Sequence, residues 1–594
     1  MKFFKNFFYL LSNSEKKKML FLLFMVFIVA ILETLGIASI MPFIAVLTNP
    51  ELIETNVILN NFYLLMRDVG IKNEKEFIFI LGIFVFLFLI ISIFIKALTT
   101  FSQYRFALMC EYSIGKRLLE TYVNKPYSWF LNRNSSDLGK NILSEVDNII
   151  QNGALPMLIL ITQSFVFIAI FLLLILINPY LTLSISLILS AIYGLIYKFS
   201  KNYLNVIGKK RFQANEQRFI TVNEAFGSPK ELKIARLENF FVNKFSLPAK
   251  HYAKYQTSAQ IISLFPRYFL EAIIFGGLIL TILYLISVNG NFNSFIPIIT
   301  LYVFAGYRIL PALQQIYNSI IRIRFVEPSI EFLLKDYENK IIKNNIKQNN
   351  MMDIKDSITI RNVDFEYPNT SKKILNFQKL NIKANSKVAL VGPTGSGKTT
   401  TIDLILGLLS PNNSILEIDG KVINYNNIGA WHNSVGYVPQ QIYLIDSTIA
   451  ANIAFGIDHN NIDYKSVESA AKIANIHEFI MNNLPNKYET KVGERGVRLS
   501  GGQRQRIGLA RALYRNPKVL ILDEATSALD SLTEKEIMGS LDKLHGKMTI
   551  VMIAHRLSTV KNCDKIFLLE KGKLKTTGKF EDLALTNSNF QNIN

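Results

Sequence analysis

Residues 492–530 read VGERGVRLSGGQRQRIGLARALYRNPKVLILDEATSALD. Within this stretch, LSGGQ (499–503) ends a loop and begins a helix expected from Gln503 to about Tyr514. Two glycines and a serine leave backbone N–H groups uncovered at the positive end of the helix dipole, where anions bind. About twenty residues later, the apolar run VLIL (519–522) has the length of a buried parallel strand.

Two acidic residues follow this strand directly. Asp523 is placed to help hold Mg²⁺, and Glu524 is placed to polarise an attacking water. Taken singly, LSGGQ also fits a simple helix cap, and VLILDE also fits a strand that ends in solvent. Their order and spacing favour nucleotide hydrolysis, with Ser500, Gly501, Gly502 and Gln503 as nucleotide-binding residues.

A second phosphate motif lies upstream, at residues 392–399. The short strand 388–391 runs into GPTGSGKT and then into the helical pattern TTTIDLILGLL, which fits G-x-x-x-x-G-K-[ST] in its strand–loop–helix context. The glycines let backbone N–H groups curl around the phosphates, Lys398 neutralises them, and the Thr399 hydroxyl reaches Mg²⁺. The nucleotide-binding residues predicted here are Gly392, Pro393, Thr394, Gly395, Ser396, Gly397, Lys398, Thr399 and Thr400.

Three further residues at strand ends are candidates for the same site. Tyr367 is placed to stack on adenine, and Gln440 to ligate Mg²⁺. His555, at the end of the strand VMIA, is placed to hydrogen-bond the γ-phosphate, so Glu524 and His555 are the predicted catalytic pair. Taken alone, Tyr367 would be an aromatic residue that only packs, Gln440 a surface amide and His555 an ordinary strand end. The predicted cofactors are ATP and Mg²⁺.

Composition separates two halves of the chain. Of the 594 residues 50% are hydrophobic, and these concentrate in the first 320 positions. The formal net charge of +20 favours anionic lipid or phosphate as partners, and without a basic-aromatic binding module we expect no nucleic acid. Cys110 and Cys563 are the sole cysteines, which excludes a disulfide framework and a cysteine-based metal site.

The first half has the pattern of a multi-pass membrane domain. Phe3, Phe4, Phe7, Phe8 and Leu11 fall at helical spacing, which favours an interfacial helix over a signal peptide. Apolar segments close to the roughly 20 residues that a bilayer requires follow. The six expected spans are 19–47, 77–108, 152–177, 180–199, 266–288 and 294–317.

The loops give the orientation. Residues 198–254 are rich in Lys and Arg, so the positive-inside rule places this segment, residues 109–150 and both termini in the cytoplasm. Both cytoplasmic loops keep a helical pattern, and we expect short helices that touch the ATPase at 126–137 and 221–229; plain solvated hairpins are the alternative. Multi-pass insertion in the bacterial inner membrane follows, with the nucleotide-binding domain in the cytoplasm.

The outward loop is expected to contain a short amphipathic helix over about 57–69. Ile58, Phe62, Leu65, Met66 and Val69 would line its apolar face. Capping of the helical bundle and contact with a substrate both remain open as roles for this helix.

Charged residues also fall within or beside the spans. They are Glu33, Lys96, Arg267, Glu271 and Arg308. Because intramembrane charge is costly, it usually faces a bundle interior or a water-filled cavity. We favour a substrate cavity with Lys96, Arg267 and Arg308 as its cations; structural pairing, such as Arg267 with Glu271 one turn away, is the alternative.

A polar, Asn- and Lys-rich segment marks the domain boundary. The predicted division is a transmembrane domain with long cytoplasmic helical extensions at 1–336, a linker at 337–353 and a nucleotide-binding domain at 354–594.

These motifs together resemble those of ABC ATPases. Tyr367, GPTGSGKT, Gln440, VGERG, LSGGQ, LILDE, SALD and His555 are similar to the A-loop, Walker A, Q-loop, X-loop, signature, Walker B, D-loop and H-loop. Six spans before one ATPase resemble a half-transporter of the type IV ABC exporters. The resemblance implies an α-helical membrane domain followed by an α/β P-loop domain, a homodimer with two ATPs between Walker A and LSGGQ of opposite subunits, and alternating access.

The membrane half resembles that of PglK-type flippases of lipid-linked oligosaccharides. The similarity rests on ETLGI (33–37) with MPF (41–43), PRYFLE (266–271) and YRILP (307–311), and implies that Lys96, Arg267 and Arg308 meet a lipid pyrophosphate. Gln314 and Gln315 depart from that pattern, where another basic residue is expected. Lipid A, phospholipid, peptide or drug export remains the alternative, and an ATP-gated channel or regulator a further one.

Overall fold

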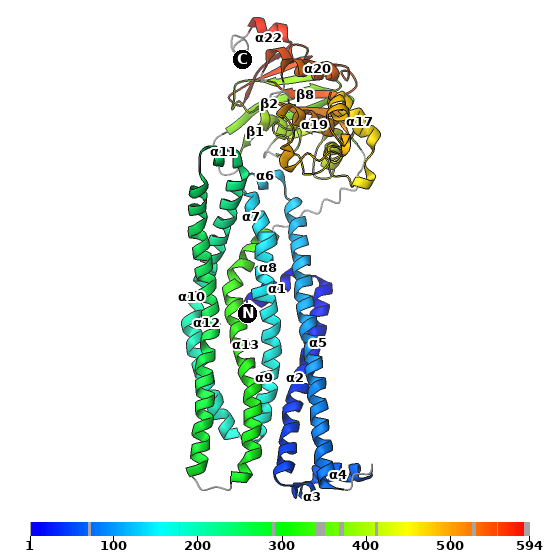
Figure 1. The fold of residues 1–594 in the computed structure, drawn as a ribbon. Coiled ribbons are helices and arrows are strands. Elements are labelled where there is room, and N and C mark those ends of the chain that lie inside the picture. The colour runs from blue at the N-terminus through cyan, green and yellow to red at the C-terminus, as the bar shows by residue number, and fades with distance from the viewer. Residues whose placement is uncertain are drawn as a thin grey trace. The chain divides into compact units, whose positions relative to one another are not determined.

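The computed structural model describes residues 2–68, 73–177, 179–287, 292–338, 351–367, 373–409, 414–525, 530–554 and 556–586. The chain forms two compact units (Figure 1). The helical unit comprises residues 1–125 and 133–341, and the α/β unit comprises residues 342–594 together with the short segment 126–132. Most of the expected linker at 337–353 lies outside the described residues, so its bounds remain a prediction.

The helical unit is built from long helices joined by short ones. Its helices are α1 (Lys2–Leu10), α2 (Asn13–Thr48), α3 (Leu52–Thr55), α4 (Val57–Asp68), α5 (Glu74–Val123), α7 (Ser135–Lys140), α8 (Val146–Ile149), α9 (Leu155–Ile177), α10 (Pro179–Gly227), α11 (Pro229–Ile234), α12 (Glu238–Ser287) and α13 (Phe292–Glu338). Two π-helical turns, η1 (Asn141–Glu145) and η2 (Ile150–Ala154), join α7, α8 and α9 into one continuous helix.

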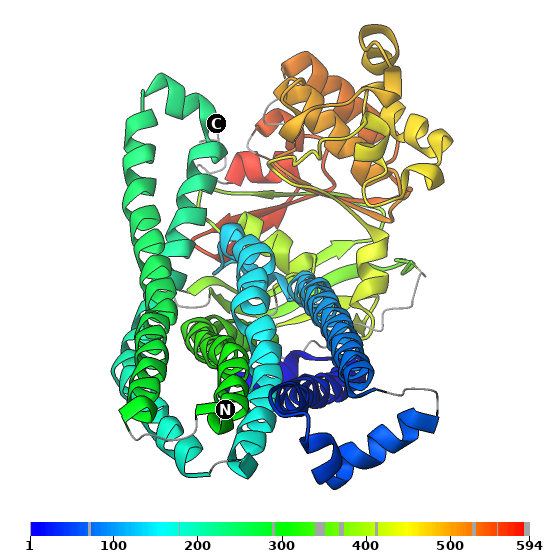
Figure 2. The same cartoon turned by 60° about the horizontal axis from the view of Figure 1, so that its bottom comes forward.

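Three segments of the described residues are long and apolar enough to cross a membrane by length and composition: Asn13–Leu47, Glu74–Val123 and Ser135–Ile177. Together with α10, α12 and α13 they give six long helical rods, as the hydrophobic pattern predicted. Helix α2 packs against α5 and α9, while α10 packs against α12 and α13 (Figures 1 and 2). The predicted fold class, a helical membrane domain followed by an α/β domain, is confirmed.

The first two helices are joined by a tight polar corner. The Ser12 backbone N–H donates to the Glu15 carboxylate at 2.6 Å, and the Glu15 N–H donates to the Ser12 hydroxyl at 3.3 Å. This reciprocal cap ends α1 and begins α2. Helix α1 forms where the sequence predicted it, and Phe3 and Phe7 of its apolar face are buried within the helical unit. A Cβ on Gly153 would lie 2.3 Å from the Phe3 ring, so this glycine makes room for Phe3.

The outward helix α4 packs on the bundle through a different face from the expected one. Phe62 and Met66 face the buried Phe77 of α5, as predicted. Leu65, however, is 65% exposed, because Tyr63 takes its place at the packed face. The predicted contact face was therefore rotated by part of a turn. Val69 lies outside the described residues.

Short helices occur at both of the turning points where they were expected, 126–137 and 221–229. Helix α6 (Tyr127–Phe130) lies at the first, within the segment 126–132 that is assigned to the α/β unit. Helix α11 begins at Pro229, because α10 continues to Gly227. The second tip is therefore placed a few residues later than predicted.

The α/β unit contains two sheets. A four-stranded antiparallel sheet has the order β2-β1-β4-β5, and a six-stranded sheet has the order β10-β9-β3-β8-β7-β6. The strands are β1 (Ser357–Glu366), β2 (Lys373–Lys383), β3 (Lys387–Val391), β4 (Ile415–Ile418), β5 (Lys421–Val422), β6 (Val435–Val438), β7 (Val519–Asp523), β8 (Thr549–Ile553), β9 (Lys565–Glu570) and β10 (Lys573–Gly578).

Helices cover both faces of the six-stranded sheet. The α-helices are α14 (Lys398–Ile405), α15 (Ile428–Ser434), α16 (Ile449–Ile453), α17 (Tyr464–Ile473), α18 (His477–Asn483), α19 (Gly501–Leu513), α20 (Ser531–Asp542), α21 (Leu557–Val560) and α22 (Phe580–Thr586). Short 3₁₀ turns are η3 (His459–Asn461), η4 (Lys487–Glu489) and η5 (Glu494–Gly496).

The six-stranded sheet separates two hydrophobic cores. Successive residues of a strand point to opposite faces, and Leu520 and Ile521 of β7 accordingly belong to different cores. Ile402 of α14 packs into the core shared with the antiparallel sheet, whereas Ile507 of α19 packs into the other. Helices α14 and α19 therefore lie on opposite faces of the same sheet.

Candidate functional site

The loop between β3 and α14 has the shape of a phosphate cradle. Gly392, Gly395 and Gly397 have φ angles of 150°, 78° and 98°, which side chains other than glycine rarely tolerate. A Cβ on Gly392 would lie 2.1 Å from the Leu569 carbonyl oxygen, and one on Gly397 would lie 2.4 Å from Leu375. Glycine is therefore required for the close backbone path as well as for its φ angles.

Two side chains of this loop are poised for an anion. The Lys398 ammonium donates to the carbonyl oxygens of Gly392 and Pro393 at 2.8 and 3.1 Å, across the mouth of the loop. Burial lowers the pKa of Lys398. The Ser396 hydroxyl is buried without a hydrogen-bond partner among the described residues. A phosphate group bound here would supply acceptors to both, so the residues fit a nucleotide phosphate.

Strand β7 delivers the acidic pair to the edge of the sheet next to this loop. It is fully buried and pairs in parallel with β6 and β8, as predicted. Tyr437 of β6 places its hydroxyl 3.4 Å from Asp523. Glu524 has a φ angle of 49°, and its carboxylate accepts a hydrogen bond of 2.7 Å from the Gln440 amide. Gln440 thus holds the predicted general base in this structure.

Of the two remaining strand-end candidates, Tyr367 lies within the described residues and His555 does not. Tyr367 lies edge-on to Phe365, and its hydroxyl is 3.1 Å from the Thr400 hydroxyl, which ties the adenine-stacking candidate to α14. His555 lies outside the described residues. Its neighbour Arg556 pairs with Glu534, which also accepts a hydrogen bond from Thr559.

The LSGGQ segment forms the start of α19. The Ser500 hydroxyl accepts from the Gln503 N–H at 3.2 Å, and the Gln503 side chain accepts from the Ser500 N–H at 2.8 Å. This reciprocal cap fixes the helix start and places Gly501 and Gly502 in its first turn. Asp530, at the end of SALD, caps α20 by accepting from the Thr533 N–H at 3.0 Å.

One ionisable residue at this site was missed by the sequence reasoning. Asp403 is buried in α14, where burial, followed by the charge of Asp523, raises the pKa of its carboxyl to about 6. The available signal was an acidic residue in the otherwise apolar run IDLILGLL. Two neighbouring carboxyls favour cation binding or partial protonation.

Comparisons with known proteins agree with this geometry. Residues 375–527 match the model of the ABC transporter family, and residues 18–309 match that of the ABC transporter transmembrane region. The "ATP-dependent lipid A-core flippase" of Saccharophagus degradans is 31% identical over 481 residues, which are 81% of this chain and 80% of that protein. This chain is an ABC transporter.

Other relatives match mainly through the ATPase. "ATP-binding cassette sub-family B member 10, mitochondrial" of Mus musculus is 44% identical over 39% of this transporter and 32% of its own length. "Multidrug resistance protein 1" of Entamoeba histolytica is 38% identical over 50% of the transporter and 22% of its own length. The solved structure of "a bacterial Atm1-family ABC exporter with ATP bound" has a TM-score of 0.78 at 22% identity, over 98% of both chains, and so shares the fold. The transporter is an ATP-hydrolysing exporter.

The cations expected in a membrane cavity have carboxylate partners in the transporter. The Glu33 carboxylate of α2, only 2% exposed, lies 2.6 Å from the Lys96 ammonium of α5 and 3.3 Å from the Arg308 guanidinium of α13. We call these three residues the membrane charge cluster. Its formal charge is +1, since two cations share one carboxylate. Arg267 pairs instead with Glu271 on α12 at 2.6 Å, and both side chains are exposed.

Proposed function

We propose that this transporter is an ATP-driven flippase that moves a lipid-linked oligosaccharide, a polyprenyl-pyrophosphate glycan, from the inner to the outer leaflet of the bacterial inner membrane. The membrane charge cluster is the observation that carries the proposal. Its surplus positive charge lies among apolar helices, where an unmatched cation is costly and an anionic ligand is therefore favoured. A lipid pyrophosphate would supply that anion at the depth of the membrane.

The cluster also suggests how a substrate could act on the helices. Glu33, Lys96 and Arg308 belong to three different long helices. A pyrophosphate that accepts hydrogen bonds from Lys96 and Arg308 would compete with Glu33 for both. Binding would therefore exchange contacts between α2, α5 and α13 for contacts with the substrate, which gives the substrate an effect on the arrangement of these helices.

A homodimer is the proposed working form. The phosphate loop begins α14 and LSGGQ begins α19, and these helices pack on opposite faces of one sheet. A nucleotide at the phosphate loop is therefore better placed to meet LSGGQ from a second copy than from its own chain. We propose two nucleotides between two copies, with Ser500 and the two following glycines donating to the phosphates.

Within each site, this chain's own residues have separable roles. Lys398 and the backbone N–H groups of the glycine loop bind phosphate. Thr399 and Asp523 would hold Mg²⁺, which supplies charge neutralisation at the phosphates when bound. Glu524, held by Gln440, orients and deprotonates the attacking water. The α/β unit would lie in the cytoplasm, where ATP is available.

Lipid A-core is the second candidate substrate. The name of the Saccharophagus degradans relative, "ATP-dependent lipid A-core flippase", favours it, and the match covers 80% of that protein's length. Lipid A is also a phosphorylated glycolipid, so the membrane charge cluster suits either molecule. The two candidates differ in the lipid: a single polyprenyl chain on a pyrophosphate, or several acyl chains on a phosphorylated disaccharide.

The deciding experiment uses the purified transporter in proteoliposomes. ATP-dependent transfer between leaflets would be followed for a labelled polyprenyl-pyrophosphate glycan and, separately, for labelled lipid A. Transfer of the first that disappears in Glu524→Gln supports the proposal. Transfer of lipid A alone selects the second candidate, and transfer of neither, despite normal ATPase activity, rejects both.

A further inference from the structure

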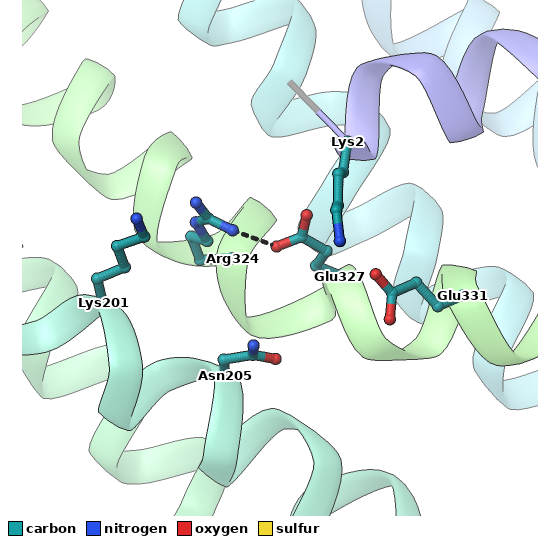
Figure 3. Close-up of a pocket in the computed structure, with 6 residues that line it drawn as sticks. All are labelled: Lys2, Lys201, Asn205, Arg324, Glu327 and Glu331. Carbon is teal, nitrogen blue, oxygen red and sulfur yellow. Dashed lines mark hydrogen bonds and ion pairs between the residues drawn. The ribbon is translucent and has the colours of Figure 1, made fainter.

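A polar pocket of about 350 Å³ opens in the helical unit between α1, α10 and α13 (Figure 3). It lies apart from the membrane charge cluster and shares no residue with it. Its lining residues are Lys2, Lys201, Asn205, Arg324, Glu327 and Glu331. On volume alone, the pocket has room for about ten waters or for one polar headgroup.

The pocket lies where the apolar part of the helices ends. Lys201 is roughly 33 Å along α10 from Pro179, at about 1.5 Å per residue, which is close to the roughly 30 Å of a bilayer's hydrocarbon core. Before it, α10 is apolar, and Leu195 and Phe199 are 58% and 81% exposed, as expected for side chains that face lipid. The pocket therefore stands at headgroup depth, on the side of the bilayer where α1 lies.

Its charges are distributed unevenly. Figure 3 shows Lys201 and Arg324 on one side of the pocket, with the Asn205 amide nearby, and Lys2 pointing between Glu327 and Glu331 on the other side. Arg324 is 2.5 Å from Glu327. Lys201 and Asn205 have no side-chain partner within the described part of the chain. With three cations and two carboxylates, the pocket has a formal charge of +1 and a ready anion-binding side.

Helix α1 is fixed over the pocket by packing. Phe3 is buried against Gly153 of η2, and α1 packs against α13, so the neighbouring Lys2 is held at the rim. A ligand that engages Lys201 of α10 and Arg324 of α13 beneath Lys2 would connect three helices of the unit. Its occupancy would therefore favour the arrangement of α1, α10 and α13 seen here.

We propose that this pocket binds the phosphate of a membrane phospholipid, with Lys201 and Arg324 as charged donors and the Asn205 amide as a third. Phosphate oxygens accept strong charge-assisted hydrogen bonds from both types of cation. The acyl chains would lie along the exposed apolar surface of α10 beside Leu195 and Phe199. The inference holds whichever substrate is transported, because it uses none of the residues of the membrane charge cluster.

The test measures lipid binding to the full-length transporter in dodecyl maltoside, a detergent without phosphate, by native mass spectrometry. Dioctanoyl phosphatidylglycerol is the probe, and dioctanoyl glycerol, which has no phosphate, is the matched lipid. We expect binding of the phospholipid alone, weakened about ten-fold by Lys201→Ala, as for loss of one charged hydrogen bond. Lys201→Arg should keep most of the affinity.

The control variant is Lys198→Ala, which removes an exposed lysine one turn earlier on α10 and outside the pocket. It should bind as the unmodified transporter does. Equal losses in Lys198→Ala and Lys201→Ala would mean diffuse attraction to a basic surface and would overturn the proposal. Displacement of the lipid by an equal concentration of inorganic phosphate would overturn it as well, because the site would then recognise free phosphate. Unchanged ATPase activity in each variant establishes that it is folded.

Discussion

The nucleotide site and the membrane charge cluster, two places where this transporter gathers cations, are built on opposite principles. In the α/β unit, the Lys398 ammonium donates to the backbone carbonyls of Gly392 and Pro393 and lies beside a glycine-rich loop of the kind that cradles phosphate. In the helical unit, Lys96 and Arg308 both pair with the buried Glu33. The ATP site is thus an anion site that is ready for its ligand, whereas in the membrane charge cluster one carboxylate already offsets half of the positive charge.

The difference reflects the environment of each site. A loop in contact with water can leave phosphate-binding groups hydrated until a nucleotide arrives. Within apolar helices an unmatched cation costs several kcal/mol, so a carboxylate of the same chain has to accompany it. A substrate in the membrane must therefore compete with a native ion pair, while ATP competes mainly with water.

The largest effect is expected when the proposed general base of the ATP site, Glu524, is replaced. Glu524→Gln should bind ATP but lower turnover by about 10²–10⁴-fold, because the attacking water loses its proton acceptor. Steady-state ATPase rates and nucleotide trapping measure this. Gln440→Ala is a useful partner, because it removes the hydrogen bond to Glu524 but leaves the carboxylate, and it should lower turnover less. Normal turnover in Glu524→Gln would refute the assignment of the base.

The second-largest effect is a loss of stability expected when the ion pairs of the membrane charge cluster are removed. Glu33→Gln leaves two cations without their carboxylate and should destabilise the helical unit by about 3 kcal/mol, the low end for a broken buried pair because Lys96 and Arg308 are partly exposed. Thermal unfolding in detergent measures it. The double variant Glu33→Gln, Lys96→Gln leaves only Arg308 without its carboxylate and should recover part of the stability. Failure to recover would show that Glu33 acts through something other than its charge.

A smaller effect concerns Asp403 beside the ATP site. Because burial raises the pKa of this carboxyl to about 6 in the folded state, the folded protein holds a proton that the unfolded chain releases at lower pH. The stabilisation from this proton is complete below about pH 4 and is lost as the pH rises through 6.

At pH 8 without Mg²⁺ or nucleotide, Asp403→Asn should therefore be more stable than the unmodified chain by about 2 kcal/mol, and at pH 4.5 by less than half as much. Urea unfolding of the full-length protein at both values of pH measures the difference. The exposed Asp458→Asn serves as the control and should show no such trend. A gain that is the same at both values of pH would contradict the raised pKa.

The smallest effect on stability is expected at Arg267. Its pair with Glu271 is exposed on one helix, so Arg267→Ala should leave the melting temperature almost unchanged. If Arg267 meets the substrate, lipid transfer should fall a few-fold while basal ATPase activity is kept. Loss of both activities together, or of neither, would remove Arg267 from the proposed substrate path.

The sequence predicted the local structure of the phosphate loop, of β7 and of the start of α19, because each is determined by nearby residues. Glycines with positive φ, a strand that ends in Asp523 and a capped helix at Ser500 are each determined within a few positions. The pairing of Lys96 and Arg308 with Glu33 was not predictable in this way. Glu33 and Arg308 come from helices far apart in the sequence, and only the packing of α2, α5 and α13 brings them together.

Rotation about a helix axis limited the sequence prediction in a similar manner. The extent of α4 was foreseen to within a residue or two, but periodicity alone did not distinguish Tyr63 from Leu65 as the residue that faces α5. For α6 and α11 the composition indicated where the turns lie, and each helix begins at or directly after a proline, Pro229 and Pro126 respectively for α11 and α6. Asp403 was overlooked because an acidic residue in an apolar run has no motif of its own.

Helix α1 packs through Phe3 against Gly153 and also packs against α13, and this affects when α1 can reach its native position during biosynthesis. A ribosome that adds about 5–20 residues per second needs roughly 15–65 s between the synthesis of Phe3 and that of Val326. During this interval α1 has been synthesised, but α13, against which it packs in the native structure, has not. Its aromatic face is then exposed to the membrane surface or to a chaperone, so the beginning of the chain is among the last parts to reach its final place.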